Sequence, residues 1–266
     1  MTTAIHRFAL LAGLLVAGVA TAAPAPDAFA PWSASYTLSR GPLTLGNADF
    51  SLSPAGKPGC HTYRYVARPV GLAKLFIGQL TEVSDFCVEQ GEIVPKAYRF
   101  SRADKAEDNY ALRFDQDSNT VFGPGEQTRP LPADATDRLL IQMAVRDFLV
   151  RNIEQRELPT QPRDFTMVED DRIKTYTLQV KGRERVKTPA GELDAIRVER
   201  IKDPRKTTLF WISPDLGYIP VRVEQRKDGS EQLSLALEAI PPGMSRPANA
   251  GAPEDDDSAH RGPRRR

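Results

Sequence analysis

Hydrophobic and polar residues alternate with a period of two along most of this chain. One series of such segments runs from residue 36 to 114 and a second from 165 to 237, with Tyr98–Ser101 as an example. Because successive side chains of a strand point to opposite faces, the pattern predicts strands with one buried face. Turn signals such as Pro189–Gly191 and Lys227–Ser230 favour antiparallel hairpins over βαβ units.

A helical spacing of apolar residues replaces this alternation between the two series. It predicts one long helix from Arg138 to Asn152, with N-cap candidates in Asp134–Asp137. The polar arc of this helix is narrow and contains Gln142 and Arg146. A helix that is apolar on most sides should be mostly buried, either as a core helix or as a lid over a ligand cavity.

About a dozen half-buried strands and one apolar helix predict a mainly β fold. Sheets of this size curl, close or split. We therefore expect a large curved antiparallel sheet, an open or half-closed barrel, with the long apolar helix packed on or in it. A two-sheet β-sandwich is the alternative. The single β-rich domain should span residues 32–240.

The two ends of the chain have a different composition. Residues 1–22 have the basic start, apolar run and small-residue end of a signal peptide, with cleavage expected near Ala22. Its apolar run is too short to span a bilayer, and no lipid-attachment cysteine follows it. Residues 23–31 should be a flexible lead-in, and the Pro-, Gly- and charge-rich residues 241–266 a disordered tail. We expect a soluble periplasmic protein that is neither anchored nor membrane-spanning after cleavage.

Charge and reactive residues exclude several functions. The 36 Lys and Arg nearly balance the 35 Asp and Glu, so the sequence argues against nucleic-acid binding. Of the three histidines, only His61 lies in the predicted domain, and we interpret it as a polar strand residue rather than part of a triad or metal site. No catalytic residue, metal site or cofactor is predicted. In an oxidising compartment, Cys60 and Cys87 should form a structural disulfide.

One short apolar segment stands apart from the strands. Val70–Gly78 is bracketed by glycines and lies between two predicted strands. As a short helix it would cap the end of the barrel. As an exposed loop it would contact a membrane or a protein client.

The stretch Thr208–Glu224, with the sequence TLFWISPDLGYIPVRVE, resembles a signature of the exported bacterial domain-of-unknown-function family 3108. The preceding Thr188–Val198 is similar to that family's hairpin. The motif positions are Trp211, Ser213, Asp215, Pro220 and Arg222. The resemblance implies export and a β-rich fold, and it implies no activity. At the level of fold alone, the chain also resembles Lol-type lipoprotein carriers, which have an open barrel with a helical lid.

The sequence leaves three functional hypotheses. The first is a non-enzymatic envelope protein that binds a lipid or other apolar ligand in a cavity, with candidate lining residues Tyr63, Tyr65, Phe100, Phe114, Met143, Phe148, Tyr176 and Trp211. The second is a structural or protein-interaction module with a fully packed core, in contact with another envelope protein. The third is a carboxylate-based envelope hydrolase, which requires two acids facing each other across a cleft.

Overall fold

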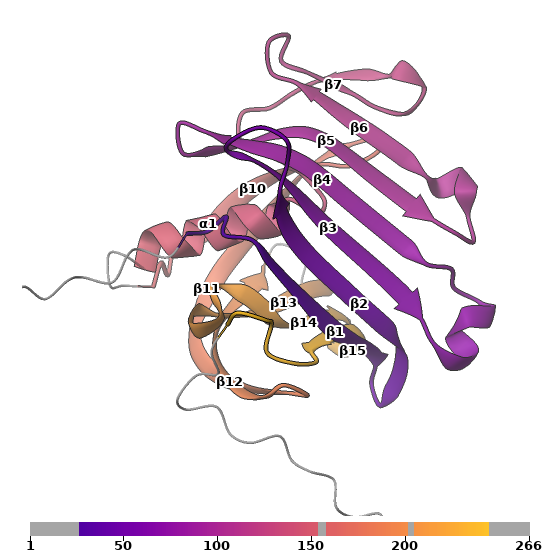
Figure 1. Ribbon diagram of the computed structural model, residues 1–266, viewed down its shortest axis with the longest axis vertical. Helices are drawn as coiled ribbons and strands as arrows, with labels where there is room; N and C mark the ends of the chain where they lie inside the picture. The colour runs from indigo at the N-terminus through magenta and orange to yellow at the C-terminus, as the bar shows by residue number, and fades with distance from the viewer. Residues whose placement is uncertain (1–26, 154–157, 202–204, 245–266) are drawn as a thin grey trace, which may run out of the picture.

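The computed structural model describes residues 27–153, 158–201 and 205–244, and these form one large β-sheet with a single α-helix (Figure 1). The predicted signal peptide, residues 245–266 of the predicted tail and part of the predicted lead-in lie outside the described residues. Among the described residues, the longest helix has 13 residues, and none is long and apolar enough to cross a membrane.

Fifteen strands make up the sheet, and we call β1–β8 its N-terminal wing and β9–β15 its C-terminal wing. The N-terminal wing consists of β1 (Trp32–Arg40), β2 (Leu43–Pro54), β3 (Cys60–Pro69), β4 (Leu80–Glu89), β5 (Glu92–Arg102), β6 (Tyr110–Asp115), β7 (Thr120–Phe122) and β8 (Thr128–Pro130). The C-terminal wing consists of β9 (Ala135–Asp137), β10 (Arg163–Val168), β11 (Ile173–Thr188), β12 (Gly191–Arg200), β13 (Lys206–Ser213), β14 (Ile219–Lys227) and β15 (Ser230–Leu237). The helix α1 (Ile141–Ile153) connects β9 to β10.

The two wings join where β1 pairs with β15, between Tyr36–Ser39 and Ser234–Leu237. The order of the strands across the sheet is β8-β7-β6-β5-β4-β3-β2-β1-β15-β14-β13-β12-β11-β10-β9, so β8 and β9 are its two edges and the sheet is not closed. This confirms the prediction of a mainly β fold with a large curved sheet. It does not support the alternative of a two-sheet sandwich.

One strand pair departs from the predicted antiparallel meander, because β9 and β10 are parallel. A parallel pair needs a crossover connection, and α1 is that connection. Since β9 has only three residues, its alternation is too short to recognise in the sequence. The sheet is therefore mixed, and the predicted helix is part of a βαβ unit.

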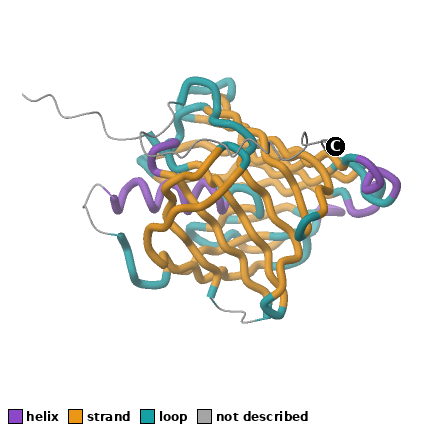
Figure 2. Tube along the Cα trace, turned by 90° about the horizontal axis from the view of Figure 1, so that it is seen from below, coloured by secondary structure: helices purple, strands orange, loops and turns teal. Residues whose placement is uncertain are grey.

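The curvature of the sheet brings β9 against β5, although no ladder of backbone hydrogen bonds joins the two strands. The Ser84 hydroxyl on β4 donates a 2.7 Å hydrogen bond to Asp137 Oδ1 on β9. Figure 2 shows the strands curving around an interior, with α1 at one end. The arrangement is an open barrel from which β6–β8 extend beyond the point of contact (Figure 1).

Helix α1 begins three residues later than predicted, at Ile141. Asp137 Oδ1 accepts hydrogen bonds from the backbone N–H groups of Leu139 and Leu140, at 2.9 and 2.8 Å, so it caps the turn that leads into the helix. The helix is partly buried, with Met143, Val145, Leu149 and Val150 fully packed, and it is not simply apolar. Arg146 is only 3% exposed, which corrects the expectation of an apolar helix.

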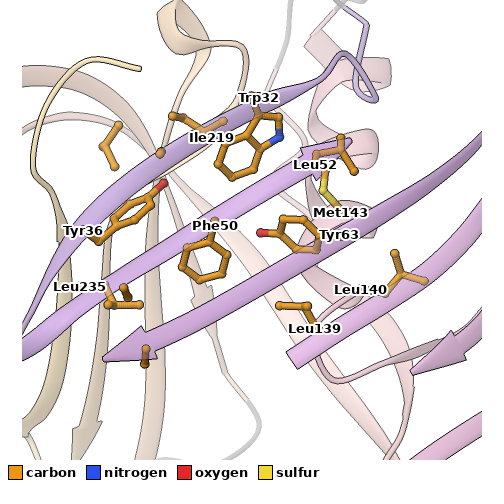
Figure 3. Packing of buried hydrophobic residues seen from close by; sticks show 14 of the residues in the cluster. Trp32, Tyr36, Phe50, Leu52, Tyr63, Leu139, Leu140, Met143, Ile219 and Leu235 are labelled. Carbon is orange, nitrogen blue, oxygen red and sulfur yellow. The ribbon is translucent and has the colours of Figure 1, made fainter. Parts of the chain in front are cut away.

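Aromatic and aliphatic side chains on the inner face of the N-terminal wing pack toward this helix (Figure 3). Phe50 and Tyr63 on neighbouring strands have ring centroids 6.0 Å apart, and Met143 of α1 belongs to the same buried cluster. The Tyr36 hydroxyl donates a 2.7 Å hydrogen bond to the Pro220 carbonyl and so links β1 to β14. Alternation along the strands therefore does bury one face.

Cys60 and Cys87 form the predicted disulfide between the paired strands β3 and β4. Beside it, the His61 ring stacks on Phe86 at 5.3 Å and also contacts Phe29. Burial lowers the pKa of His61. The histidine is part of an aromatic stack near the end of the sheet, consistent with its interpretation as a strand residue.

Candidate functional site

A cavity of about 710 Å³ lies between the two wings and α1. The N-terminal wing contributes mostly aromatic lining from β1–β3, and the C-terminal wing contributes residues from β10–β15. Pockets that bind small molecules typically measure roughly 300–1,000 Å³ and are largely apolar with a few polar groups. The space is therefore of the size and general character of a ligand site.

Four of the eight predicted lining residues face this cavity: Tyr63, Tyr65, Met143 and Tyr176. The other four do not line it. Phe100 and Phe114 are buried in the core of the N-terminal wing, and Phe148 borders a separate apolar space of about 10 Å³. Trp211 packs elsewhere, because its neighbours Phe210 and Ile212 take the cavity-facing positions of β13.

Trp211 belongs to a small second layer on the other face of the C-terminal wing. Its indole N–H donates to Glu184 on β11, and the Arg222 guanidinium lies 5.7 Å from its ring centroid. Ser213 is fully buried, Asp215 lies in the short turn Pro214–Leu216, and of the five motif positions only Pro220 lines the cavity. The motif therefore has a mainly structural place in this fold.

The enclosed end of the cavity carries a cluster of hydrogen-bond donors that we call the closed-end cluster: Trp32, Tyr63, Gln142 and Arg146. Arg146 Nε donates to the Gly217 carbonyl at 2.9 Å, and its guanidinium lies 5.7 Å from the Trp32 ring centroid. The Tyr63 hydroxyl donates to Gln142 Oε1 at 3.1 Å. Two buried donors in this cluster, Arg146 Nη1 and Trp32 Nε1, have no hydrogen-bond partner among the described residues.

The electrostatics of Arg146 are unusual for a cation. No described carboxylate forms an ion pair with it, and burial lowers its pKa to about 10, with Asp27 and the Tyr63 and Tyr36 hydroxyls opposing the shift. A buried charge without a counter-charge is costly. Among the described residues, the closed-end cluster therefore lacks an acceptor for Arg146 Nη1 and an acid in direct contact with its guanidinium.

A second polar group on the cavity wall, which we call the Glu82 cluster, is complete by contrast. Glu82 is 4% exposed and accepts hydrogen bonds from Arg138 at 2.7 Å and from the Tyr98 hydroxyl at 2.6 Å. The charge of Glu82 raises the pKa of Arg138 against the opposing effect of burial. Each carboxylate oxygen of Glu82 therefore has a donor.

Asp137 lies next to this cluster but does not line the cavity. Burial raises its pKa to about 7, against the hydrogen bonds from Ser84 and from the backbone of Leu140 and Leu139. Its Oδ2 has no partner among the described residues, which suits a protonated carboxyl group. The acid is thus a helix cap, and it does not face Glu82 across an accessible cleft.

The exposed lining residues mark the opening of the cavity. Lys206, Arg226 and Lys227 are exposed at the ends of β13 and β14, and Arg200 stacks 4.1 Å from the Tyr176 ring centroid nearby. Six cationic and two acidic residues line the cavity as a whole. Both acids are paired, Glu82 with Arg138 and Glu169 with Lys174 and Arg172.

The apolar segment Val70–Gly78 lies at the same end of the strands as this opening. It contains a short 3₁₀ helix, Gly71–Leu75, in which no residue is buried. Leu72, Leu75 and Phe76 are 79%, 73% and 79% exposed. The segment therefore does not pack as a cap on the barrel, and the alternative of an exposed loop describes it.

The polar residues of the cavity were missed by reasoning from sequence. Gln142 and Arg146 were recognised only as the narrow polar arc of the helix, and Glu82 was one acid among many. The available signal was the i, i+4 spacing of Gln142 and Arg146 on a helix expected to be buried. Among the described residues, no group of three or more His, Cys, Asp and Glu is placed to hold a metal ion.

The fold and the cavity define a class of protein: an open mixed β-sheet that encloses a space beside a single helix. A family model described as "Protein of unknown function (DUF3108)" matches residues 35–236. The chain belongs to this family, which confirms the resemblance seen in Thr208–Glu224. No curated protein matches the chain. The likeness to Lol-type carriers receives no support from these comparisons.

Proposed function

We propose that the protein is a non-enzymatic binding protein of the bacterial cell envelope that holds a lipid or another apolar ligand in its cavity. The observation that carries the proposal is the space of about 710 Å³ beside α1, lined by Phe50, Tyr65 and other apolar side chains. A space of this size between packed layers is far larger than the voids of an ordinary core. It also disfavours the hypothesis of a fully packed module.

Export to the periplasm is part of the proposal and rests on the signal-peptide pattern of residues 1–22. The Cys60–Cys87 disulfide supports it, because such bonds form in oxidising compartments. The hydrolase hypothesis finds less support. The two acids that line the cavity are both held in ion pairs, which leaves neither as an obvious acid or base.

The test is ligand binding by the exported protein. Native mass spectrometry after gentle extraction from the envelope should show a co-purified lipid, and the delipidated protein should bind the neutral fluorescent probe Nile red. A variant that blocks the cavity needs a large side chain on the cavity wall, where Leu235 lies. Ala34 and Ala48 belong to the packed core and do not line the cavity, so enlarging them would not block it. L235W should lower Nile red affinity, whereas S33W, at an exposed position of β1, should not. A clean ligand-free mass together with no probe binding would refute the proposal.

An interaction module is a second candidate because of the exposed apolar segment Val70–Gly78. Single exposed hydrophobic residues are ordinary, but Leu72, Leu75, Phe76 and Ile77 are exposed together. If the segment binds an envelope protein, L72S/F76S should abolish a specific cross-link that the wild type forms. Retained Nile red binding by this variant would separate the two candidate functions.

A further inference from the structure

We infer that the ligand of this cavity is an anionic amphiphile whose carboxylate or phosphate head binds Arg146 at the closed end, with its apolar chain extending toward the opening. The inference rests on the proposed function, since it names the class of ligand for the same cavity. Its basis is the closed-end cluster, and in particular the buried guanidinium of Arg146, which among the described residues has an unpartnered donor and no ion pair.

Arg146 Nη1 and Trp32 Nε1 are both buried donors without a partner in the part of the chain that the structure describes, and both residues line the cavity. An arginine has no acceptor atom, and neither does the indole of tryptophan. The Gln142 carbonyl already accepts a hydrogen bond from the Tyr63 hydroxyl. The site therefore offers donors to an incoming acceptor.

Arg146 is 3% exposed and forms no ion pair with a described acid, whereas Arg138, on the same cavity wall, is paired with Glu82. Charge-assisted bonds from a guanidinium are about twice as strong as neutral ones, and its planar fork matches a carboxylate or phosphate. An anionic head would pair directly with the guanidinium and accept hydrogen bonds from the unpartnered N–H groups of Arg146 and Trp32.

Between the closed-end cluster and the opening, the cavity is lined by apolar groups such as Phe50, Tyr65, Val223 and Leu235. A small free anion would leave most of this apolar space unoccupied. An alkyl chain would fill it, at roughly 0.8 kcal/mol for each buried CH₂ group.

The experiment compares two ligands that differ only in the head group: palmitic acid and 1-hexadecanol. The protein has two tryptophans, so W211F leaves Trp32 as the sole fluorescent reporter, at the closed end. Palmitic acid should bind the W211F protein about tenfold more tightly than hexadecanol and change Trp32 emission, since a hydrogen bond to a charged group contributes about 1.5–3 kcal/mol.

Substitutions on this background locate the head group. R146M should abolish the preference for palmitic acid, because it removes the charge-assisted bond between the guanidinium and the carboxylate. The affinity for hexadecanol, which has no carboxylate, should stay within about twofold. K227M is the matched control, because it removes one cation from the exposed opening of the same cavity. It should leave the preference unchanged. R146Q provides the same comparison if R146M does not fold, as judged by circular dichroism.

The outcomes are distinct. Equal affinity of the wild type for acid and alcohol would overturn the inference but leave the proposed function standing. Loss of the acid preference in K227M and not in R146M would overturn the location of the head. Displacement of palmitic acid by acetate or inorganic phosphate alone would show a small-anion site and overturn the amphiphile. If neither palmitic acid nor hexadecanol binds, the proposed function fails as well.

Discussion

The Glu82 cluster and the closed-end cluster lie on the wall of one cavity, and each contains a buried or partly buried arginine. Arg138 in the first cluster is paired with Glu82, which also accepts a hydrogen bond from Tyr98. Arg146 in the closed-end cluster has a backbone carbonyl as its acceptor, and its Nη1 has no partner among the described residues. The first arrangement is satisfied within the protein, whereas the second leaves a buried donor that a ligand could satisfy.

This difference separates a structural polar group from a binding group. Removing one partner of a buried ion pair leaves the other charge stranded, while removing an unpaired charge leaves no charge behind. The two clusters should therefore lose very different amounts of stability on the same kind of substitution. Stability can be measured without knowledge of the ligand.

The largest effect should come from R138M. It leaves the carboxylate of Glu82, which is 4% exposed, without its cation, and should lower the free energy of unfolding by about 3 kcal/mol. This value is at the lower end of the usual range for buried pairs, because the Arg138 side chain is 41% exposed. R146M should change it by only about 1 kcal/mol or less, since one hydrogen bond to the Gly217 carbonyl is lost. Urea denaturation of the ligand-free protein measures both.

The double variant E82Q/R138M is the control for this comparison. It removes the stranded charge as well, so most of the stability lost in R138M should return. If R146M proves as damaging as R138M, Arg146 already has a counter-charge within the protein and the contrast between the clusters disappears.

A smaller effect should come from D137N, which tests the neighbouring acid. The folded-state pKa of Asp137 is about 7, above the value of about 3.9 for an unfolded chain, so the folded state binds the extra proton between these values. The stability from Asp137 is thus fully present near pH 4 and is lost as the pH rises toward 7. D137N should match the wild type below about pH 4 and exceed it by on the order of 2 kcal/mol near pH 5.5.

Urea denaturation of wild type and D137N across this pH range provides the measurement. Because all other titrating groups are shared, the difference between the two curves isolates Asp137. A difference that does not vary with pH would show that Asp137 is ionised in the folded protein throughout.

The smallest effect should distinguish two buried tyrosines. Y98F removes a hydroxyl that donates to the charged Glu82, and Y63F removes one that donates to the neutral Gln142 amide. Bonds to charged groups contribute about 1.5–3 kcal/mol and neutral ones about 1 kcal/mol, so Y98F should cost about 1 kcal/mol more than Y63F. Thermal or urea unfolding of both variants tests this, and equal losses would contradict the assignment of a charged Glu82.

Local patterns in the sequence predicted much of the fold. The alternation in segments such as Tyr98–Ser101 is a property of single strands, and turns such as Lys227–Ser230 determine which strands pair as hairpins. The disulfide could be predicted because Cys60 and Cys87 are the only two cysteines of the sequence. By contrast, the parallel pairing of β9 with β10 depends on how the sheet curls, which no local pattern records.

The candidate site was only half predictable for the same reason. Tyr63, Tyr65, Met143 and Tyr176 line the cavity, but Phe100, Phe114, Phe148 and Trp211 have the same apolar character and pack elsewhere. Alternation says that a side chain is on a buried face, and it does not say whether that face meets another side chain or an open space.

The sequence alone determined the class of fold, the helix, the disulfide and the family, because each depends on residue types at short or fixed spacings. The tertiary structure decided that the interior is partly open, that α1 connects two parallel strands, and that Arg146 is buried without an ion pair to a described acid. These features depend on the curvature of a fifteen-stranded sheet, which is the sum of many small twists and so cannot be assigned to any one segment.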